Sequence, residues 1–76
     1  MRDLVLWLVQ QLVEDKPSVK VDALDRDRST VLELTVAQDD LGRVIGRGGR
    51  TAKAIRTVLD IAARQQGRRA VLDILD

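Results

Sequence analysis

The feature that most limits how this chain can fold is a glycine cluster, Gly46-Arg47-Gly48-Gly49, between two segments predicted to be helical. These segments are residues 41–45 and residues 50–65, and the second carries its apolar residues on one face. Glycine adopts positive φ without steric cost, ends helices, and lets another molecule approach the backbone closely. The cluster therefore predicts a tight turn between two helices, around which the rest of the chain must be arranged.

The first half of the chain predicts one helix and two strands. Leucines and valines recur at helical spacing and indicate a helix over residues 2–15, of which one stripe can face the core. Pro17 follows it, and the residue before a proline avoids helical backbone. Alternating apolar and polar residues predict strands at residues 19–24 and 31–37. The polar residues 25–30 between them predict the turn of an antiparallel hairpin.

The second half predicts two helices and a last strand. Asp39 and Asp40 carry side-chain oxygens that can cap the helix at residues 41–45. Helix 50–65 ends at Gly67, and residues 70–75 read as a strand. This strand follows a helical crossover, so we expect it to run parallel to the strand before the crossover. The order α-β-β-α-α-β then predicts an α+β fold, with a three-stranded mixed sheet and helices on one face.

The size and composition of the chain argue against an enzyme. Its 76 residues make room for one small domain, over residues 1–76. The chain has no cysteine and no histidine, which excludes disulfides and thiolate metal sites and removes the commonest general base. Catalysis would have to use carboxylates or Lys53, and no paired constellation is visible. We therefore expect no catalytic activity, no metal, no cofactor and no small-molecule substrate.

The apolar run at residues 4–9 is too short to cross a membrane. A spanning helix needs about 20 apolar residues. Asp3 precedes the run and no small-residue cleavage site follows it, which argues against a signal peptide. We expect a cytoplasmic protein that does not associate with membranes.

The charges of the chain are separated along its length. Residues 1–40 hold five basic and nine acidic side chains, a net charge of −4. Residues 41–69 hold eight basic side chains and one acidic, a net charge of +7. A charge run can simply be a solvated helix face. The asymmetry equally suggests a surface that attracts polyanions, centred on the segment that contains the glycine cluster.

The glycine cluster has the properties of a phosphate-binding loop. It leads into the start of a helix, where free N–H groups and the helix dipole favour an anion. Arg43, Arg47 and Arg50 surround it, and Lys53 lies one turn further on. The mononucleotide loop needs four residues between its glycines, followed by Lys and Ser or Thr. The dinucleotide fingerprint needs a preceding strand, so neither of these motifs is present.

The segment Val-Ile-Gly-x-x-Gly-x-x-x-x-x-Ile, from Val44 to Ile55, resembles the core of the KH domain. In that family the Gly-x-x-Gly loop clamps the backbone of about four nucleotides. The element order matches the type II, or bacterial, arrangement, and the resemblance covers essentially the whole chain. The short length and residues 42–51 resemble the small single-domain bacterial KH proteins of the KhpA (YlqC) family. The resemblance implies binding of single-stranded RNA, as an RNA chaperone or post-transcriptional regulator, with a link to cell division and cell size.

The resemblance also implies roles for individual residues. The glycine loop would hold the sugar-phosphate backbone, and an aliphatic groove beside it would hold the bases. Residues 66–69 correspond to the variable loop on the opposite rim of the groove. The family commonly has Lys where this chain has Gly48, which predicts weaker or more flexible phosphate contact. The residues expected to contact RNA are Arg43, Val44, Ile45, Gly46, Arg47, Gly48, Gly49, Arg50, Thr51, Lys53, Ile55, Arg68 and Arg69.

Several of these residues also have a purely structural interpretation. For Ala52 and Ile55, both expected at the groove, we favour an ordinary core position, since the floor of the groove is continuous with the core. Arg43 could pair with Asp39 or Asp40 and never meet RNA. Outside the expected site, Arg56 and Arg64 are predicted to be solvated surface.

The first helix offers a surface for a protein partner. Trp7 is the only aromatic residue, and it lies away from the leucine stripe of that helix, either at the edge of the core or in an interface. Val58 on the long helix marks a second candidate surface. The KhpA resemblance implies a homodimer, a heterodimer with a larger Jag-type (KhpB) KH protein, or both. The alternative function is therefore a protein-interaction module, in which RNA binding is weak or secondary.

Overall fold

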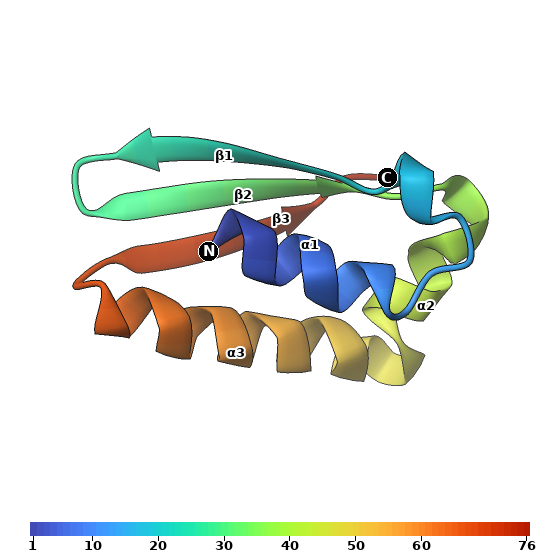
Figure 1. Ribbon diagram of the computed structural model, residues 1–76. Helices are drawn as coiled ribbons and strands as arrows, with labels where there is room; N and C mark the ends of the chain where they lie inside the picture. The colour runs from blue at the N-terminus through green and yellow to red at the C-terminus, as the bar shows by residue number, and fades with distance from the viewer.

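The computed structural model describes all residues, Met1–Asp76, as a three-stranded sheet with helices on one face (Figure 1). The order α-β-β-α-α-β is the predicted one. No helix combines the length and the apolar character needed to cross a membrane. The elements are α1 (Arg2–Gln10), β1 (Lys20–Arg26), β2 (Ser29–Thr35), α2 (Leu41–Ile45), α3 (Arg50–Gln65) and β3 (Arg69–Ile74), with single 3-10 turns at Lys16–Ser18, Gln38–Asp40 and Arg47–Gly49.

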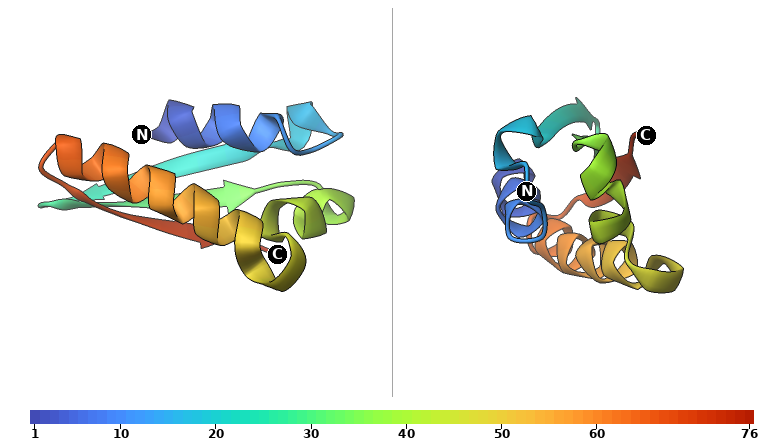
Figure 2. Two further views of the ribbon diagram at one scale, coloured as in Figure 1. Left: turned by 90° about the horizontal axis from the view of Figure 1, so that it is seen from below. Right: turned by 90° about the vertical axis from the view of Figure 1, so that its right-hand side faces the viewer.

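The sheet has the strand order β1-β2-β3, with β2 in the centre. β1 pairs with β2 antiparallel, and β3 pairs with β2 parallel. The parallel pair follows from the crossover through α2 and α3, as expected from the sequence. The end-on view in Figure 2 shows the sheet on one side of the molecule and α1 and α3 on the other. The opposite face of the sheet carries no helix.

The core lies between the sheet and the two long helices. From α1 and the segment that follows it, the core takes a stripe of valines, since Val5, Val9 and Val13 are buried while Leu12 is exposed. From the sheet it takes the side chains that point toward the helices. The ten members of the cluster are Val5, Val9, Val13, Val21, Leu32, Leu34, Val44, Ile55, Leu59 and Leu72.

The first helix is shorter than the predicted helix at residues 2–15. It ends at Gln10, and the backbone leaves the helix before Glu14. The amides of Glu14 and Asp15 donate to the two carboxylate oxygens of Asp40, at 3.1 and 3.0 Å. A tertiary contact thus competes with helical hydrogen bonds here. Pro17 explains only why the helix could not continue further.

Asp40 was expected to cap the helix at residues 41–45, and this expectation was wrong. It occupies the position before α2, but its side chain makes no capping bond. The buried carboxylate instead binds the two amides described above, and it accepts a hydrogen bond from Arg43 at 2.9 Å. These backbone amides, chiefly that of Asp15, hold the pKa of Asp40 below its ordinary value of 3.8, with Arg43 adding to the effect.

The hairpin is tighter than its polar sequence suggested. Residues 25–30 were predicted as a turn, but the turn is only Asp27-Arg28, and both strands run through the polar residues around it. The buried hydroxyl of Thr30 donates to Asp25 at 2.6 Å. Because this pair satisfies both groups, polar residues can continue the ladder. The strands accordingly cover Lys20–Arg26 and Ser29–Thr35, in place of residues 19–24 and 31–37.

Candidate nucleic-acid interface

The glycine cluster forms a tight turn between α2 and α3. Gly46, Gly48 and Gly49 all have positive φ, at 76°, 64° and 78°. A Cβ atom on Gly46 would lie 2.8 Å from the backbone nitrogen of Thr51 and 2.7 Å from its Cβ, so no side chain fits there. A Cβ on Gly48 or Gly49 would meet nothing within 4 Å. Gly46 is therefore required by packing, while Gly48 and Gly49 leave the outer side of the turn open.

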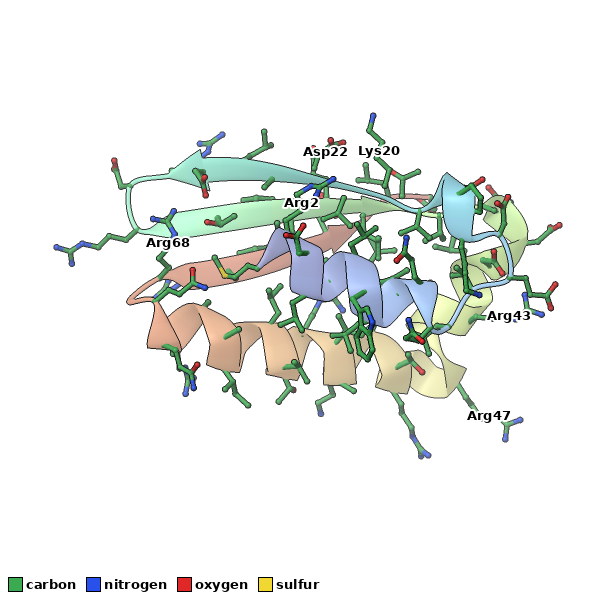
Figure 3. All side chains as sticks on the ribbon, viewed as in Figure 1. Arg2, Lys20, Asp22, Arg43, Arg47 and Arg68 are labelled. Carbon is green, nitrogen blue, oxygen red and sulfur yellow. The ribbon has the colours of Figure 1, made fainter.

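Basic side chains around the turn have no partners within the protein. The side chains of Arg47, Arg50 and Lys53 take part in none of the ion pairs of the chain. All three are exposed, and Figure 3 shows Arg47 extending from the turn into solvent. The turn also leads directly into α3, a helix of 16 residues whose dipole favours an anion at this end. The arrangement is suited to binding phosphate.

A groove runs from this turn along the edge of the molecule between α3 and β3. It consists of three adjoining hollows, counted from the glycine turn. Arg56 lines both the first and the second hollow, and Asp60 lines both the second and the third. A 16-residue helix is roughly 24 Å long, so the groove is long enough for several nucleotides. It begins beside Gly49 at the glycine turn and ends at Gly67 in the α3–β3 connection.

The groove changes in character along its length. Next to the turn, its walls include the aliphatic side chains of Leu41, Ile45, Ala52 and Ile74. At the far end, apolar side chains are absent from the lining, which includes Arg28, Arg64 and Arg69. Apolar walls beside a phosphate-binding turn are suited to unstacked bases, and basic walls are suited to more backbone.

Comparison with known proteins identifies the family. A family model described as "KhpA/KhpB, KH domain" matches residues 2–74. The chain belongs to this KH-domain family. It is 46% identical to the RNA-binding protein KhpA of Halalkalibacterium halodurans over 76 residues, which is 100% of both chains. It is 45% identical to the RNA-binding protein KhpA of Borreliella burgdorferi, over 97% of this chain and 90% of the relative. No solved structure matches the chain significantly.

The family assignment confirms the predicted fold and agrees with the expectation that the chain is not an enzyme. A further relative, at 40% identity over 100% of this chain and 96% of its own length, is the RNA-binding protein KhpA of Aquifex aeolicus. These relatives are named for RNA binding and not for a reaction. No group of three or more acidic side chains lies close enough together to hold a metal ion.

The KH fold places several of the expected contact residues at the turn or in the groove. Ile45, Gly49, Lys53 and Arg69 line the groove, and Arg47 and Arg50 stand beside the turn. Val44 and Ile55 are buried in the core, so their side chains cannot touch a base. Both belong to the core cluster, which agrees with the structural interpretation of Ile55.

Two arginines that were expected to contact RNA instead form hydrogen bonds within the protein. Arg43 donates to Asp40 at 2.9 Å and to Glu14 at 2.8 Å, as the alternative pairing with Asp40 predicted. Arg68 donates to the hydroxyl of Thr30 at 3.1 Å and to the backbone oxygens of the hairpin turn. Figure 3 shows Arg68 lying along that turn. Both side chains thus brace the scaffold.

Sequence reasoning missed four residues that line the first hollow of the KH groove: Leu41, Arg56, Ile74 and Asp76. Arg56 was predicted to be solvated surface. It is exposed, as predicted, and it also lines two of the hollows and donates to the backbone oxygen of Leu72 at 3.3 Å. A signal for it was present, because positions 53, 56 and 60 follow one face of α3. Nothing in the sequence placed the end of β3 next to α2.

A separate hollow, between α1 and α3, lies apart from the three hollows of the KH groove. Its eight lining residues include Trp7 and Leu12 of the first helical segment, and Ile55 and Val58 of α3. The side chains of Trp7 and Val58 are 60% and 42% exposed. The two candidate partner surfaces that the sequence suggested therefore form one apolar surface, which we call the α1/α3 hollow. Thr51, an expected RNA contact, also lines this hollow.

Proposed function

We propose that this protein binds single-stranded RNA through the glycine turn and the groove between α3 and β3. The observation that carries the proposal is the set of unpaired basic side chains, Arg47, Arg50 and Lys53, at the open turn where an aliphatic groove begins. The names of the relatives, which describe RNA-binding proteins, support the same function.

Some residues of the site contact the phosphates of the RNA, and others contact its bases. The glycine turn and its three basic neighbours hold the sugar-phosphate backbone, and Arg69 meets it again at the far end of the groove. Ile45 and Ile74 provide aliphatic contact for the bases. Because few groups are placed to read base edges, the site discriminates little between sequences. Arg43 and Arg68 keep the scaffold in shape.

One KH unit binds few nucleotides, so we propose that the protein acts as a dimer, or together with a larger KhpB-type KH protein. Pairing raises the effective concentration of the second site without any new RNA contact. Such an assembly can act as an RNA chaperone or a post-transcriptional regulator in the cytoplasm. The family description, which joins KhpA with KhpB, supports a common recognition domain in both proteins.

The test is binding of a labelled single-stranded RNA pool at low and moderate salt. The variant carries Arg47→Asp and Gly48→Asp, which places two acids where phosphate is expected and leaves the core unchanged. The matched control carries Lys16→Asp and Ser18→Asp, which lowers the net charge by the same three units at the exposed turn between α1 and β1. We expect the native chain and the control to bind, and the folded variant to lose binding at least about tenfold. Equal binding by all three proteins would reject this site.

The α1/α3 hollow favours a second candidate function, a protein-interaction module. Its apolar lining and exposed Trp7 are features of interface anchors. We propose a KhpB-type KH protein as the occupant. Val58→Asp should then abolish co-elution with that partner in size-exclusion chromatography and leave RNA binding unchanged. Retained co-elution would show that the partner docks elsewhere.

A further inference from the structure

A single acidic side chain lies in the otherwise basic groove. Residues 41–69 hold eight basic side chains and one acidic side chain, that of Asp60. Asp60 belongs to α3 and lines both the second and the third hollow. Its side chain is 46% exposed, so an RNA strand in the groove would meet the carboxylate. Because a carboxylate repels phosphate, the part of the strand that lies against Asp60 is the edge of a base and not the backbone.

The carboxylate of Asp60 is held in place and keeps free acceptor positions. Its Oδ2 atom forms an ion pair with Arg64 at 2.9 Å, one helical turn further along α3. Its Oδ1 atom takes part in none of the ion pairs of the chain. Each carboxylate oxygen has two lone pairs, so both oxygens can accept a further hydrogen bond. Asp60 is therefore an oriented acceptor that suits two neighbouring N–H donors.

Arg56 supplies a hydrogen-bond donor to the second hollow, which Asp60 also lines. The two residues are four positions apart on α3, which places their Cβ atoms roughly 5–6 Å apart. Opposite charges at this spacing commonly pair, but here each has another partner: Arg56 donates to the backbone oxygen of Leu72 at 3.3 Å, and Asp60 pairs with Arg64. A guanidinium group has five N–H donors, so Arg56 keeps others available. The hollow thus offers a donor and a two-position acceptor that separate partners hold apart.

The remaining lining of the second hollow is suited to the face of a base. Ala70 and Val71 of β3 contribute apolar surface, and the side chain of Val71 is 47% exposed. Of the other polar residues, Thr57 donates its hydroxyl to the backbone oxygen of Lys53 at 3.0 Å, and Lys53 belongs with the basic side chains near the glycine turn. An apolar surface with one donor and one acceptor at its rim fits a single unstacked base.

Guanine is the base whose edge matches these groups. Its Watson–Crick edge presents the acceptor O6, followed by two adjacent donors, N1–H and N2–H. Adenine and cytosine each have one donor group on this edge, and the single donor of uracil lies between two acceptors. Guanine alone therefore fills both acceptor positions of Asp60 and at the same time gives Arg56 an oxygen.

We propose that the second hollow selects a guanine base in single-stranded RNA, with Asp60 accepting from N1–H and N2–H and Arg56 donating to O6. The proposal rests on the proposed function, since a base reaches this hollow only when the RNA lies in the groove. Binding along the rest of the strand stays tolerant of sequence, and selection is confined to this one position. Asp60 thereby acts as a specificity-determining residue, and the cost of an acid in a groove for a polyanion is offset by the hydrogen bonds to guanine.

The test compares labelled RNAs of about eight nucleotides, twice the length that a KH loop clamps. One is oligouridine, a second carries a single guanosine at its middle, and a third carries inosine there. Inosine differs from guanosine only in lacking the N2 amino group, so length, charge and the number of binding registers are matched. We expect the native chain to bind the guanosine RNA at least about tenfold more tightly than the inosine RNA.

Three variants assign the preference to individual side chains. Asp60→Ala should bind the guanosine and inosine RNAs equally, and it should bind oligouridine slightly more tightly, because a negative charge has left the groove. The matched control Asp73→Ala removes the same charge from an exposed position of β3 outside the groove, and it should keep the native preference. Arg56→Ala should weaken binding of the guanosine and inosine RNAs alike, since both bases keep O6. Circular dichroism confirms that each variant is folded.

The outcomes separate this proposal from the proposed function. Equal binding of the guanosine and inosine RNAs by the native chain would overturn the guanine site, as would a guanosine preference that Asp60→Ala retains. Tighter binding of an RNA with adenosine or cytidine at the same position would overturn it too. In each of these cases the proposed function still stands if the Arg47→Asp, Gly48→Asp variant loses RNA binding. A native chain that binds none of these RNAs would reject both.

Discussion

At the scale of single residues, the glycine turn combines one position that packing requires with two that are open. Gly46 packs against Thr51 and has φ 76° and ψ 170°, a conformation that is essentially restricted to glycine. Gly48 has φ 64° and ψ 19°, the left-handed region that other residues enter at moderate cost, and it has free space around it. The same residue type thus serves two purposes within three positions.

Substitutions at these two positions should separate stability from binding. Gly46→Ala should lower the free energy of unfolding by about 3 kcal/mol, since backbone strain and a clash with Thr51 add together. Gly48→Lys should lower it by only about 1 kcal/mol and should strengthen RNA binding, because it adds a cation where phosphate is expected. Urea denaturation and RNA titration measure the two quantities. Equal destabilisation by both substitutions would contradict this account of the turn.

At the scale of elements, a few polar side chains determine where the helices and strands end. Asp40 binds the amides of Glu14 and Asp15 and thereby ties the segment after α1 to the start of α2. Arg68 does the same for the hairpin, where it bonds the backbone oxygens of Arg26 and Ser29 at 3.1 and 2.9 Å. Both are long-range contacts, which explains why periodicity misplaced the end of α1 and the extent of the hairpin turn.

The hydrogen bonds of the Asp40 carboxylate should make the stability of the fold depend on pH at acidic pH. The pKa of Asp40 is lower in the folded chain than its ordinary 3.8, so its contribution is complete above that value and is lost as pH falls through the folded pKa. Asp40→Asn should therefore be less stable than the native chain at pH 7, and the difference should shrink progressively below pH 3.8. Urea denaturation at several pH values measures it. The exposed neighbour variant Asp39→Asn serves as control and should differ little from the native chain at any pH.

At the scale of the whole molecule, the fold sorts the basic side chains into two classes. Of the eight in residues 41–69, the ion pairs occupy Arg43, Arg64 and Arg68. Those around the glycine turn have no partner and face solvent at one end of the groove. A net charge of +1 for the chain thus conceals a concentrated basic surface. Long-range attraction of a polyanion follows from this distribution and not from the total charge.

The salt dependence of RNA binding should distinguish the two classes. Alanine at Arg47, Arg50 or Lys53 should each reduce the slope of log K against log salt by up to about 1, because one phosphate contact is lost. Lys20→Ala, which breaks only the exposed pair with Asp22 on β1, away from the groove, should leave the slope nearly unchanged. RNA titrations at four or more salt concentrations give the slopes. A flat slope for the native chain would mean that phosphate contacts do not drive binding.

The order of elements, the mixed sheet, α2 and the extent of α3 followed from the sequence, because periodicity, proline and glycine are local signals that act within a few residues. The position of the glycine turn followed for the same reason, as did the basic character of the segment around it. Tertiary structure decided that the valines of the first helical segment are buried, that Asp40 and Arg68 hold together distant parts of the backbone, and that Val44 and Ile55 lie in the core. It also placed Arg56 and Ile74 in the groove. These features depend on which distant residues meet, and no local pattern carries that information.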